Sequence, residues 1–448
     1  MQRSSQQLRD DAQKIWWAGV QAVQPAQLIP EYVVATNDTL RIGNQDFDLQ
    51  AIGRIVVVGA GKAGASMTQA LETALGENLL RSKQVTGWVN VPADCMGATQ
   101  CVHLHPARPA GQNEPTQAGV QGAEEILKLV SNLDSRDLCL CLLSGGASAL
   151  LPAPISNLSL DTKRQLTRDI SAHGGTIHQL NTLRRELSRI KGGGLARACQ
   201  ANQLVSLILS DVPGDDLATI ASGPTVLRQP SQQAAIQVLC DLELQNTPAG
   251  KKATDFLQRP PEILPTNTTD VTNVLIGNNA TAVDAAGVQA EQLGYSHAMI
   301  SATEPEATAE QVADGLIDMA QTMRRQEGPD CLISGGEPTV QLANEAERGL
   351  GGRNQQLVLS ALASLPDWHN LALLSGGTDG EDGPTDAAGA VVNEQIAKQA
   401  SALKLDAQDY LNRNDAYHFF EKVDSLIKTG PTHTNVCDLR VVTVAKDR

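Results

Sequence analysis

The segment VVVGAGKAG, residues 56–64, places a lysine inside a glycine-rich loop, and such a loop could bind phosphate. Gly59, Gly61 and Gly64 follow a β-branched run with the spacing G-x-G-x-x-G, which is typical of dinucleotide-binding loops. Lys62 adds a compact cation at an expected helix N-terminus, where it would attract a phosphate or a carboxylate. The loop is therefore compatible with holding a nicotinamide cofactor or with holding phosphate groups during their transfer.

The nicotinamide interpretation requires an acidic residue at the end of the next strand, about 20 residues further on. That strand ends in WVNVP, with Asn90 at the expected position and Asp94 only beyond Pro92. The Walker A pattern is also absent from the sequence. The missing acid favours phosphate handling, and dinucleotide binding is kept as the alternative.

The tripeptide Ser-Gly-Gly follows an apolar strand-like run three times, in LLSGGASAL, LISGGEPTV and LLSGGTDGE. Two glycines at a strand end let the backbone approach a ligand and direct its N–H groups at an anion. A tight turn alone would explain one copy, whereas three copies favour a phosphate-rich site. The residues predicted to bind substrate or nucleotide in these loops are Ser144, Gly145, Gly146, Ser148, Gly335, Gly336, Glu337, Gly376 and Gly377, in addition to Gly59, Gly61 and Gly64.

Further basic residues occur in NTLRRELSRIKGGGLA, residues 181–196. Its periodicity predicts a helix on which Arg184, Ser188 and Lys191 form one stripe. We predict that Arg184 and Lys191 face a bound anion. The alternative for Lys191 is that it only complements the dipole at the end of the helix.

Carboxylates and one arginine complete the set of candidate residues. Asp211 follows an apolar strand and could hold Mg²⁺ or accept a proton from a hydroxyl group. Arg353 lies in a glycine loop that opens a helix, where an arginine can clamp a transferring phosphoryl group. Asp379 and Asp386 lie in an acidic, glycine-rich loop, residues 375–392, and are the predicted metal ligands. A turn-rich surface loop is the alternative there.

The elements that must position these residues alternate between strands and helices. This alternation predicts an α/β protein with a mostly parallel sheet in each domain and with ligands at the carboxyl ends of the strands. A chain of 448 residues exceeds what one core usually serves, so we expect two domains. A segment rich in Pro, Thr and Asn, 244–270, interrupts the alternation, and we place the boundary near its end. The predicted domains are residues 1–265 and 266–448.

Specific ranges follow from the same patterns. The predicted strands are 54–59, 84–91, 138–143, 204–209, 273–277, 296–301, 330–334, 371–375 and 439–444. The predicted helices are 61–76, 115–131, 160–171, 177–190, 280–293, 307–326 and 354–364, and the first 23 residues form a further amphipathic helix.

The net charge of −15 argues against a nucleic-acid partner, because phosphate backbones require a basic surface. Small anionic substrates stay compatible with it, since they need only a local cluster of cations. No apolar run reaches the roughly 18 residues of a membrane span. The amphipathic N-terminal residues lack the apolar core of a signal peptide. We therefore expect a cytoplasmic protein without a membrane partner.

Taken together, these motifs resemble the glycerate 2-kinase family, whose C-terminal half is known as the MOFRL domain. The resemblance runs from about residue 8 to residue 445, and eight motifs in the same order make it highly specific. The matching segments are VVVGAGKAGASM, LLSGGASALLPAP, NTLRRELSRIKGGGLA, LSDVPGDDLATIASGPT, ISGGEPTVQL, GGRNQQLVLSAL, LSGGTDGEDGPTDAAGA and GPTHTNVCDL.

The resemblance implies transfer of the γ-phosphoryl group of ATP to the 2-hydroxyl of D-glycerate, with Mg²⁺, giving 2-phosphoglycerate and ADP. It implies a Rossmann-like three-layer N-terminal domain, a smaller α/β MOFRL domain and an active site in the cleft between them. The family's active-site lysine falls on Lys62 and its arginine on Arg353, while Asp211 and the Ser-Gly-Gly loops are carried over by motif only. The implied partners are the small molecules D-glycerate and ATP, and the choice between monomer and homodimer stays open.

The sequence also departs from the family pattern. Glu186 stands where the family commonly has His, and residues 102–115 match the usual HPxPD motif only loosely. We expect these departures to affect affinity or substrate choice and not to abolish phosphoryl transfer. Because the family has also carried the name hydroxypyruvate reductase, an NAD(P)H-dependent reductase is the alternative enzyme, and a non-catalytic metabolite-binding protein is the third hypothesis.

Overall fold

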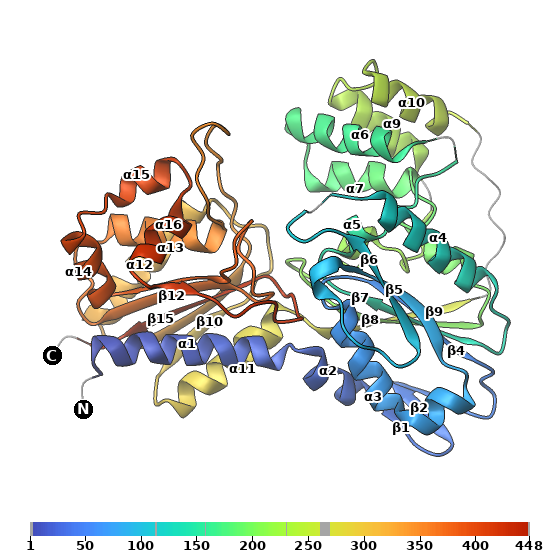
Figure 1. The fold of residues 1–448 in the computed structure, drawn as a ribbon, viewed down its shortest axis with the longest axis horizontal. Coiled ribbons are helices and arrows are strands. Elements are labelled where there is room, and N and C mark those ends of the chain that lie inside the picture. The colour runs from blue at the N-terminus through green and yellow to red at the C-terminus, as the bar shows by residue number, and fades with distance from the viewer. Residues whose placement is uncertain (1–2, 113, 157, 230, 260–268, 447–448) are drawn as a thin grey trace. The chain divides into compact units, whose positions relative to one another are not determined.

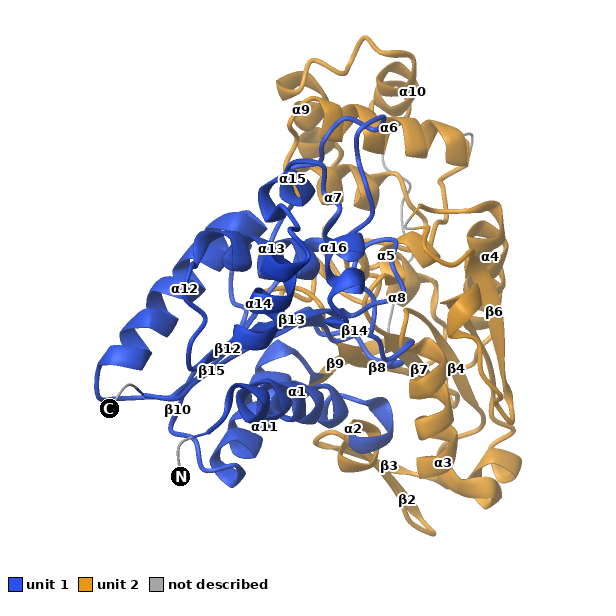
Figure 2. Cartoon of the chain, turned by 60° about the vertical axis from the view of Figure 1, so that its left-hand side comes forward, with its two compact units in different colours: residues 1–27, 277–448 blue, residues 28–276 orange. Residues whose placement is uncertain are grey.

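The computed structural model describes residues 3–112, 114–156, 158–229, 231–259 and 269–446. The chain divides into two compact units (Figure 2), unit 1 with residues 1–27 and 277–448 and unit 2 with residues 28–276. The first 27 residues thus belong to the same unit as the C-terminal residues and not to the predicted N-terminal domain. The predicted boundary between residues 265 and 266 lies outside the described residues.

Unit 2 is built on a six-stranded sheet with the order β6-β5-β4-β7-β8-β9. The four pairs β6–β5, β5–β4, β4–β7 and β7–β8 are parallel, as the sequence predicted for the first domain. The strand order reverses between β4 (Ile55–Ala60) and β7 (Leu138–Leu143), so their carboxyl ends form a topological switch point. Open parallel sheets of this kind bind ligands at that point.

The apolar runs of β4 and β7 are fully buried, because helices cover both faces of a parallel sheet. One core cluster joins these strands to α4 and α5. A second cluster belongs to a helical group of α6, α7, α9 and α10, which lies at the top of Figure 1. Helix α7 is therefore held by its own apolar core, which includes Leu183 and Leu187.

The remaining elements of unit 2 complete this arrangement. A small antiparallel sheet comprises β1 (Val33–Ala35), β2 (Thr39–Ile42) and β3 (Gln45–Asp48). The other strands are β5 (Thr86–Pro92), β6 (Val102–Arg108), β8 (Gln203–Leu209) and β9 (Asp270–Gly277). The helices are α2 (Pro25–Tyr32), α3 (Gly64–Ser82), α4 (Gln117–Ser131), α5 (Ala147–Leu150), α6 (Leu160–Ala172), α7 (Ile177–Glu186), α8 (Gly194–Ala198), α9 (Gln232–Asp241) and α10 (Pro248–Leu257), with 3₁₀ turns at Ala93–Cys95 and Ile220–Ser222.

Unit 1 contains the second six-stranded sheet, with the order β10-β11-β15-β12-β13-β14. Only β10 and β11 pair in parallel, and the other pairs are antiparallel. The prediction of a mostly parallel sheet in the second domain is therefore wrong. The physical reason is that β15 (Asp438–Val444) inserts between β11 (Cys331–Gly336) and β12 (Leu371–Gly377) and runs against both.

Helices cover both faces of this sheet (Figure 1). Helices α1 and α11 share one core cluster with one face, and α12, α13 and α16 share another with the opposite face. Unit 1 is thus a three-layer α/β/α structure. Its remaining elements are α1 (Ser5–Ala22), α11 (Asn279–Gln292), β10 (His297–Ile300), α12 (Ala309–Arg325), α13 (Arg353–Ser364), β13 (Gly389–Asn393), α14 (Glu394–Ala402), α15 (Ala407–Asn412), α16 (Ala416–Lys422) and β14 (Leu426–Ile427).

Helix α1 shows how the sequence pattern determines this packing. Ser4 and Gln7 form a capping box at its start, which satisfies otherwise unpaired N–H groups. The predicted apolar face, represented by Leu8, Ile15 and Trp16, is fully or almost fully buried against the unit 1 sheet. In the described part of the chain, no helix is long and apolar enough to cross a membrane.

Each predicted strand coincides with an observed one within a few residues, while β1, β2, β3, β6, β13 and β14 were not predicted. The predicted helix at 177–190 ends at Glu186, so Lys191 lies beyond it. The segment 244–270 contains helix α10, and its residues 260–268 lie outside the described residues.

Candidate active site

The glycine loop between β4 and α3 uses its own N–H groups within the protein. The amide of Gly61 donates to the Asn90 carbonyl at 3.2 Å, and that of Lys62 donates to the Gly145 carbonyl at 2.9 Å. The Ala63 amide donates to Ser144 Oγ at 3.0 Å, and the Gly64 amide donates to the Gly61 carbonyl. A dinucleotide loop would instead present such amides to a pyrophosphate. These loop amides are therefore engaged within the protein, and the catalytic role of the Lys62 side chain stays a prediction.

The glycines of the loop permit close packing. A Cβ on Gly59 would overlap the Leu142 carbonyl of the neighbouring strand, and a Cβ on Gly64 would press on Val89 and Val91. Gly61 has φ +149°, and a Cβ there would overlap Ser144 Oγ. Gly59 thus lets β4 approach β7, Gly64 lets α3 approach β5, and Gly61 lets the loop approach Ser144. Their role in nucleotide binding stays a prediction.

The first Ser-Gly-Gly loop follows β7 at the switch point of the unit 2 sheet. Gly146 has φ +78°, a backbone conformation that favours glycine. A Cβ on Gly146 would lie 3.5 Å from Lys62 Cγ and 3.7 Å from Arg108 Nη2. Arg108 ends β6 and is buried. One cation from the loop after β4 and one from the end of β6 therefore lie near this loop.

A small cavity of about 150 Å³, here called the anion pocket, opens beside the same loop. Three basic side chains line it, Lys163 from α6, Arg184 from α7 and Lys191 from the segment after α7, and among the described residues no carboxylate lines it. The other lining residues are Pro115, Gly146, Ser148, Ala149, Pro152, Leu160 and Thr167. The predicted residues Arg184, Lys191, Gly146 and Ser148 are thus brought together, although Lys191 is not on the helix.

The electrostatics of the anion pocket are those of uncompensated positive charge. Burial lowers the pKa of Lys163 to about 7, and the nearby charge of Arg184 contributes. Burial, Arg184 and Lys163 together lower the pKa of Lys191 well below its usual value. Burial also lowers the pKa of Arg184. A bound anion would reverse these effects, because an opposite charge stabilises the protonated forms.

Lys191 is the buried anchor of this pocket. Its Nζ donates to the Ser148 carbonyl and to Ser148 Oγ, both at 2.6 Å. Ser148 Oγ also lies 3.0 Å from Ser222 Oγ, which donates to Asn181 Oδ1 at 3.2 Å. This chain of polar contacts connects the Ser-Gly-Gly loop to helix α7.

The predicted carboxylate Asp211 follows β8, the strand next to β7, so it lies at the same sheet edge as the Ser-Gly-Gly loop. Of its neighbours, Asp216 accepts hydrogen bonds from the Ala218 amide and the Thr219 hydroxyl. Asp216 therefore stabilises the turn in which it lies, as carboxylates in such loops often do.

The predicted arginine of unit 1, Arg353, is the first residue of α13 and is held by carboxylates. Its Nε and Nη2 donate to the two carboxylate oxygens of Asp438 at 2.7 and 2.9 Å, and its Nη1 donates to Glu337 at 2.8 Å. Burial acts to lower the pKa of Arg353, but the charges of Asp438 and Glu337 and the hydrogen bonds to Asp438 raise it well above its usual value. Such bidentate pairs fix both position and orientation.

Asp382 positions the start of the same helix. It is buried and accepts hydrogen bonds from the Asn354 amide at 3.0 Å and the Gln355 amide at 2.8 Å, so it caps α13 directly after Arg353. A carboxylate at a helix N-terminus is favourable because of the helix dipole. Burial nevertheless raises the pKa of Asp382 to about 7, and these amide hydrogen bonds act against that rise.

The second and third Ser-Gly-Gly copies are the ends of strands β11 and β12. Gly336 and Gly377 both stand opposite Asp438, the first residue of β15, which lies between the two strands. Gly335 and Gly376 are opposite Leu439 in the same way. The two copies therefore frame the carboxylate that holds Arg353, and their predicted role as phosphate-binding loops stays a prediction.

The acidic loop after β12 supplies the predicted metal ligands. Asp386 accepts hydrogen bonds from the Tyr417 hydroxyl at 2.7 Å and from Lys428 Nζ at 3.1 Å, and these two contacts lower its pKa. Asp379 is placed differently, because a Cβ on Gly377 would lie 3.0 Å from Asp379 Oδ1 and 3.6 Å from Asp438 Oδ1. Two carboxylates thus converge over Gly377.

Within the described residues, no group of three or more His, Cys, Asp or Glu side chains could hold a metal ion. Mg²⁺ is commonly bound by only one or two carboxylates together with substrate phosphates. Asp379 and Asp438 lie together over Gly377, where Asp438 already accepts two hydrogen bonds from Arg353, whereas Asp386 is held apart from them by Tyr417 and Lys428. The assignment of Asp379 and Asp386 as metal ligands stays a prediction.

Sequence reasoning missed four residues of these sites: Arg108, Lys163, Asp382 and Asp438. Lys163 had no signal beyond its place on an amphipathic helix, and Arg108 lay in a strand that was not predicted. Asp382 was among the acidic residues of the loop 375–392, and Asp438 ends the motif GPTHTNVCDL. The only local sequence feature that could have singled out Asp438 was its place directly before the last predicted strand.

Comparisons with known proteins agree with the resemblance in the sequence. Residues 11–258 match the family described as Domain of unknown function (DUF4147), and residues 330–438 match the MOFRL family. Human glycerate kinase is 36% identical over 98% of this chain and 94% of the human protein. The chain belongs to the glycerate kinase family.

Two further matches, one in sequence and one in structure, come from Thermotoga maritima. A protein named D-glycerate 2-kinase is 34% identical, covering 87% of this chain and 90% of that protein. A crystal structure of glycerate kinase matches with a TM-score of 0.80 at 32% identity, covering 98% of this chain and 100% of that chain. The MOFRL match lies within unit 1, where it includes both Arg353 and Asp438.

Proposed function

We propose that this protein transfers the γ-phosphoryl group of ATP to the 2-hydroxyl of D-glycerate, forming 2-phosphoglycerate and ADP. The observation that carries the proposal is the anion pocket, where Lys163, Arg184 and Lys191 face a small cavity that no carboxylate lines. Its volume of about 150 Å³ suits a three-carbon acid, since pockets for larger organic ligands measure about 300–1,000 Å³. The names of the related kinases support the choice of glycerate.

In this proposal the anion pocket binds the glycerate carboxylate. Arg184 and the ammonium groups of Lys163 and Lys191 neutralise it, and the charge-assisted hydrogen bonds fix its orientation. Lys62, beside Gly146, stabilises negative charge on the transferring phosphoryl group. Asp211, at the same sheet edge, accepts the proton of the 2-hydroxyl group of glycerate. The oxygen of that hydroxyl group forms the new bond to phosphorus, and the bond between this phosphorus and ADP breaks.

The carboxylates around Arg353 are proposed to serve the nucleotide. Asp438, Glu337 and Asp382 outnumber the one arginine, so this region favours a phosphate chain that carries Mg²⁺ over a bare anion. Asp379 and Asp438 are the residues that would hold Mg²⁺, which would neutralise charge on the phosphates when bound. Arg353, fixed by two carboxylates, stabilises charge on the phosphoryl group as it moves.

Two assays on one purified sample test the proposal. The first supplies ATP, Mg²⁺ and D-glycerate and detects 2-phosphoglycerate through enolase, which accepts that isomer directly. The second supplies hydroxypyruvate and NADH and follows the loss of NADH. Turnover in the first assay alone is expected, because the loop amides of residues 61–64 are bonded within the protein and β5 carries no carboxylate for a ribose.

Turnover in the second assay alone would overturn the proposal and restore the reductase alternative. Turnover in neither assay, together with binding of glycerate, would favour a metabolite-binding protein. A matched pair of variants makes the first assay specific. Lys191→Met removes the buried ammonium of the anion pocket and should abolish most activity, whereas Lys128→Met, on the exposed face of α4, should leave it unchanged.

A further inference from the structure

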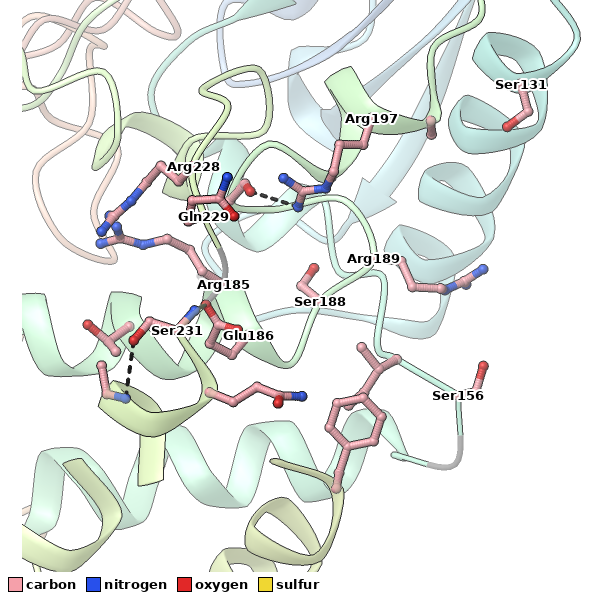
Figure 3. A pocket seen from close by; sticks show the side chains of 18 of the residues that line it. Ser131, Ser156, Arg185, Glu186, Ser188, Arg189, Arg197, Arg228, Gln229 and Ser231 are labelled. Atoms are coloured by element: carbon pink, nitrogen blue, oxygen red, sulfur yellow. Dashed lines mark hydrogen bonds between the residues drawn. The ribbon is translucent and has the colours of Figure 1, made fainter. Parts of the chain in front are cut away.

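A second and larger cavity of about 580 Å³ lies within unit 2 and is not part of the site described above (Figure 3). Four arginines line it, Arg185, Arg189, Arg197 and Arg228, and Glu186 is the one acidic residue among the described residues of the lining. We call it the arginine cavity. Its volume falls within the range of pockets that bind whole organic ligands, and it is too large for a single small anion.

Three of these guanidinium groups carry unpaired positive charge. Arg185 donates to the Asn181 carbonyl at 3.1 Å and Arg197 donates to the Gly192 carbonyl at 2.8 Å. In the described part of the chain, neither of them nor Arg228 forms an ion pair with a carboxylate. Glu186 accepts a hydrogen bond from the Ser231 amide at 2.9 Å. Arg189 differs, because it pairs with Glu124 and points away from the cavity in Figure 3.

Burial lowers the pKa of Arg197, and the charge of Glu186 offsets only part of this effect. Several guanidinium groups gathered in one concave site repel each other unless an anion is shared among them. The protein as a whole is strongly acidic, with a net charge of −15, so the gathering of arginines is local and not a property of the surface. The cavity also has an apolar wall that includes Ile155 and Phe256.

The arginine cavity and the anion pocket share one framework. Arg184 lines the anion pocket and the next residue of α7, Arg185, lines the arginine cavity. In the same way, Lys191 lines the anion pocket and the next residue, Gly192, lines the arginine cavity. A Cβ on Gly192 would lie 3.1 Å from the Arg185 side chain. The Gly192 amide donates to the Ser222 carbonyl, and Ser222 contacts Ser148 of the anion pocket.

We propose that the arginine cavity binds a small organic phosphate and that its occupancy changes the affinity of the anion pocket through α7 and the segment 188–194. Arg185, Arg197 and Arg228 would hold the phosphate, because the guanidinium fork matches phosphate oxygens in two-pronged contacts. The apolar wall would take the organic part. The binding step is independent of the proposed kinase activity, and only the coupling rests on it.

Binding is tested by calorimetry on the full chain without Mg²⁺ and without glycerate. The two probes are fructose 1,6-bisphosphate and ADP, which share phosphate chemistry and distinguish a sugar from a nucleotide. The double variant Arg185→Gln and Arg228→Gln should bind the better probe about tenfold more weakly or worse, as expected for lost hydrogen bonds to a charged group. The control, Arg81→Gln and Arg136→Gln, removes the same charge from exposed positions and should keep the affinity.

A variant of the anion pocket locates the binding. Lys163→Gln should leave the affinity for the probe unchanged, and a loss in this variant equal to that of the double variant would overturn the proposal. No binding of either probe, or equal binding by the cavity and control variants, would overturn it as well. In the glycerate assay, the better probe should change the KM for glycerate at least twofold in the wild type and not in the double variant. Binding that leaves this KM unchanged would overturn the coupling.

Discussion

The two cationic sites of the molecule hold their charges in opposite ways. In unit 2, Lys163, Arg184 and Lys191 line a cavity without a carboxylate, and burial lowers the pKa of each. In unit 1, Arg353 is enclosed by Asp438 and Glu337, and despite its burial these groups raise its pKa. Among the described residues, the first site has no carboxylate beside its cations, whereas the second has the carboxylates of Asp438 and Glu337.

This contrast assigns different tasks to the two sites. A cluster of buried cations without a carboxylate partner costs stability, and either deprotonation or an anionic ligand relieves that cost, so the unit 2 site is suited to recognising a substrate. An arginine held by carboxylates is oriented before any ligand arrives, so the unit 1 site is suited to acting in a transition state. Substitutions in the two sites should therefore separate effects on KM from effects on kcat.

The largest effect is expected for Arg353→Ala. Loss of a preorganised cation should lower kcat about 10²–10³-fold in the coupled enolase assay, with little change in the KM for glycerate. It also leaves the fully buried Asp438 without its partner, which should lower the free energy of unfolding by about 3–5 kcal/mol. Urea unfolding measures this second quantity.

The double variant Arg353→Ala and Asp438→Asn separates the two consequences. It removes the unpaired buried charge, so stability should be largely restored while kcat stays low. If kcat returned together with stability, Arg353 would be only a structural partner of Asp438, and the contrast between the two sites would fail.

A smaller effect, and of the opposite kind, is expected for Arg184→Gln. Removing one charged partner of the glycerate carboxylate should cost about 1.5–3 kcal/mol of binding, which corresponds to a KM raised about 10–100-fold with kcat nearly preserved. Initial rates over a range of glycerate concentrations measure it. The matched control is Arg168→Gln on the neighbouring helix α6, whose exposed guanidinium pairs with Glu114 and does not line the pocket. A fall in kcat at constant KM would contradict the assignment of this site to substrate recognition.

The sequence predicted the parts of each site that follow from local pattern. The fully apolar runs before Ser144 and Asp211 identified buried parallel strands, and parallel strands bring their carboxyl ends to one edge. Arg184 and Lys191, predicted to lie on one stripe, line a common cavity, although the chain reaches it by a turn and not by a continuous helix. Periodicity reports which residues of one element are buried, and in unit 2 this identified the strands and part of the pocket lining.

The site in unit 1 depends on pairing between distant segments, which periodicity cannot report. Asp438 holds Arg353 only because the last strand inserts between β11 and β12 and runs against both. The same alternation of strands and helices would fit a parallel sheet, in which Asp438 would have other neighbours. Lys163 was missed for a related reason, because a lysine on an amphipathic helix is normally solvated and only the packing of α6 beside α7 makes it part of a pocket.

A pH series sharpens the contrast further. In the free enzyme Lys163 has a pKa of about 7, so raising the pH above 7 removes a positive charge from the anion pocket. The KM for glycerate should therefore rise with pH, by up to about tenfold per unit, until the pKa of the bound form is reached. Lys191 faces the same space with a pKa that is also lowered, and Arg184 stays charged throughout.

The variant Lys163→Arg keeps its charge at every pH used, so it should weaken this dependence and leave the part due to Lys191. The exchange Lys128→Arg on exposed α4 is the control and should leave the profile unchanged. The effect of pH on the stability of the fold is opposite to its effect on glycerate binding. The folded protein binds fewer protons than the unfolded chain between about pH 7 and 10.5, so Lys163 makes the free energy of unfolding rise with pH in that window. A KM that is constant between pH 6 and 9 would show that Lys163 does not contact the substrate.

The smallest effect is expected for Asp386→Asn, and it tests how the acidic loop of unit 1 is used. Asp386 is exposed and pairs with Lys428 and Tyr417, and an exposed ion pair contributes at most about 1 kcal/mol to stability. The variant should change kcat less than twofold and leave the Mg²⁺ concentration for half-maximal rate unaltered. Asp379→Asn is the matched change in the same loop, and it should raise that concentration because Asp379 lies with Asp438 over Gly377. If Asp386→Asn raised the Mg²⁺ requirement and Asp379→Asn did not, the metal would lie beside Lys428. Arg353 would then stabilise the phosphate chain without a neighbouring metal ion.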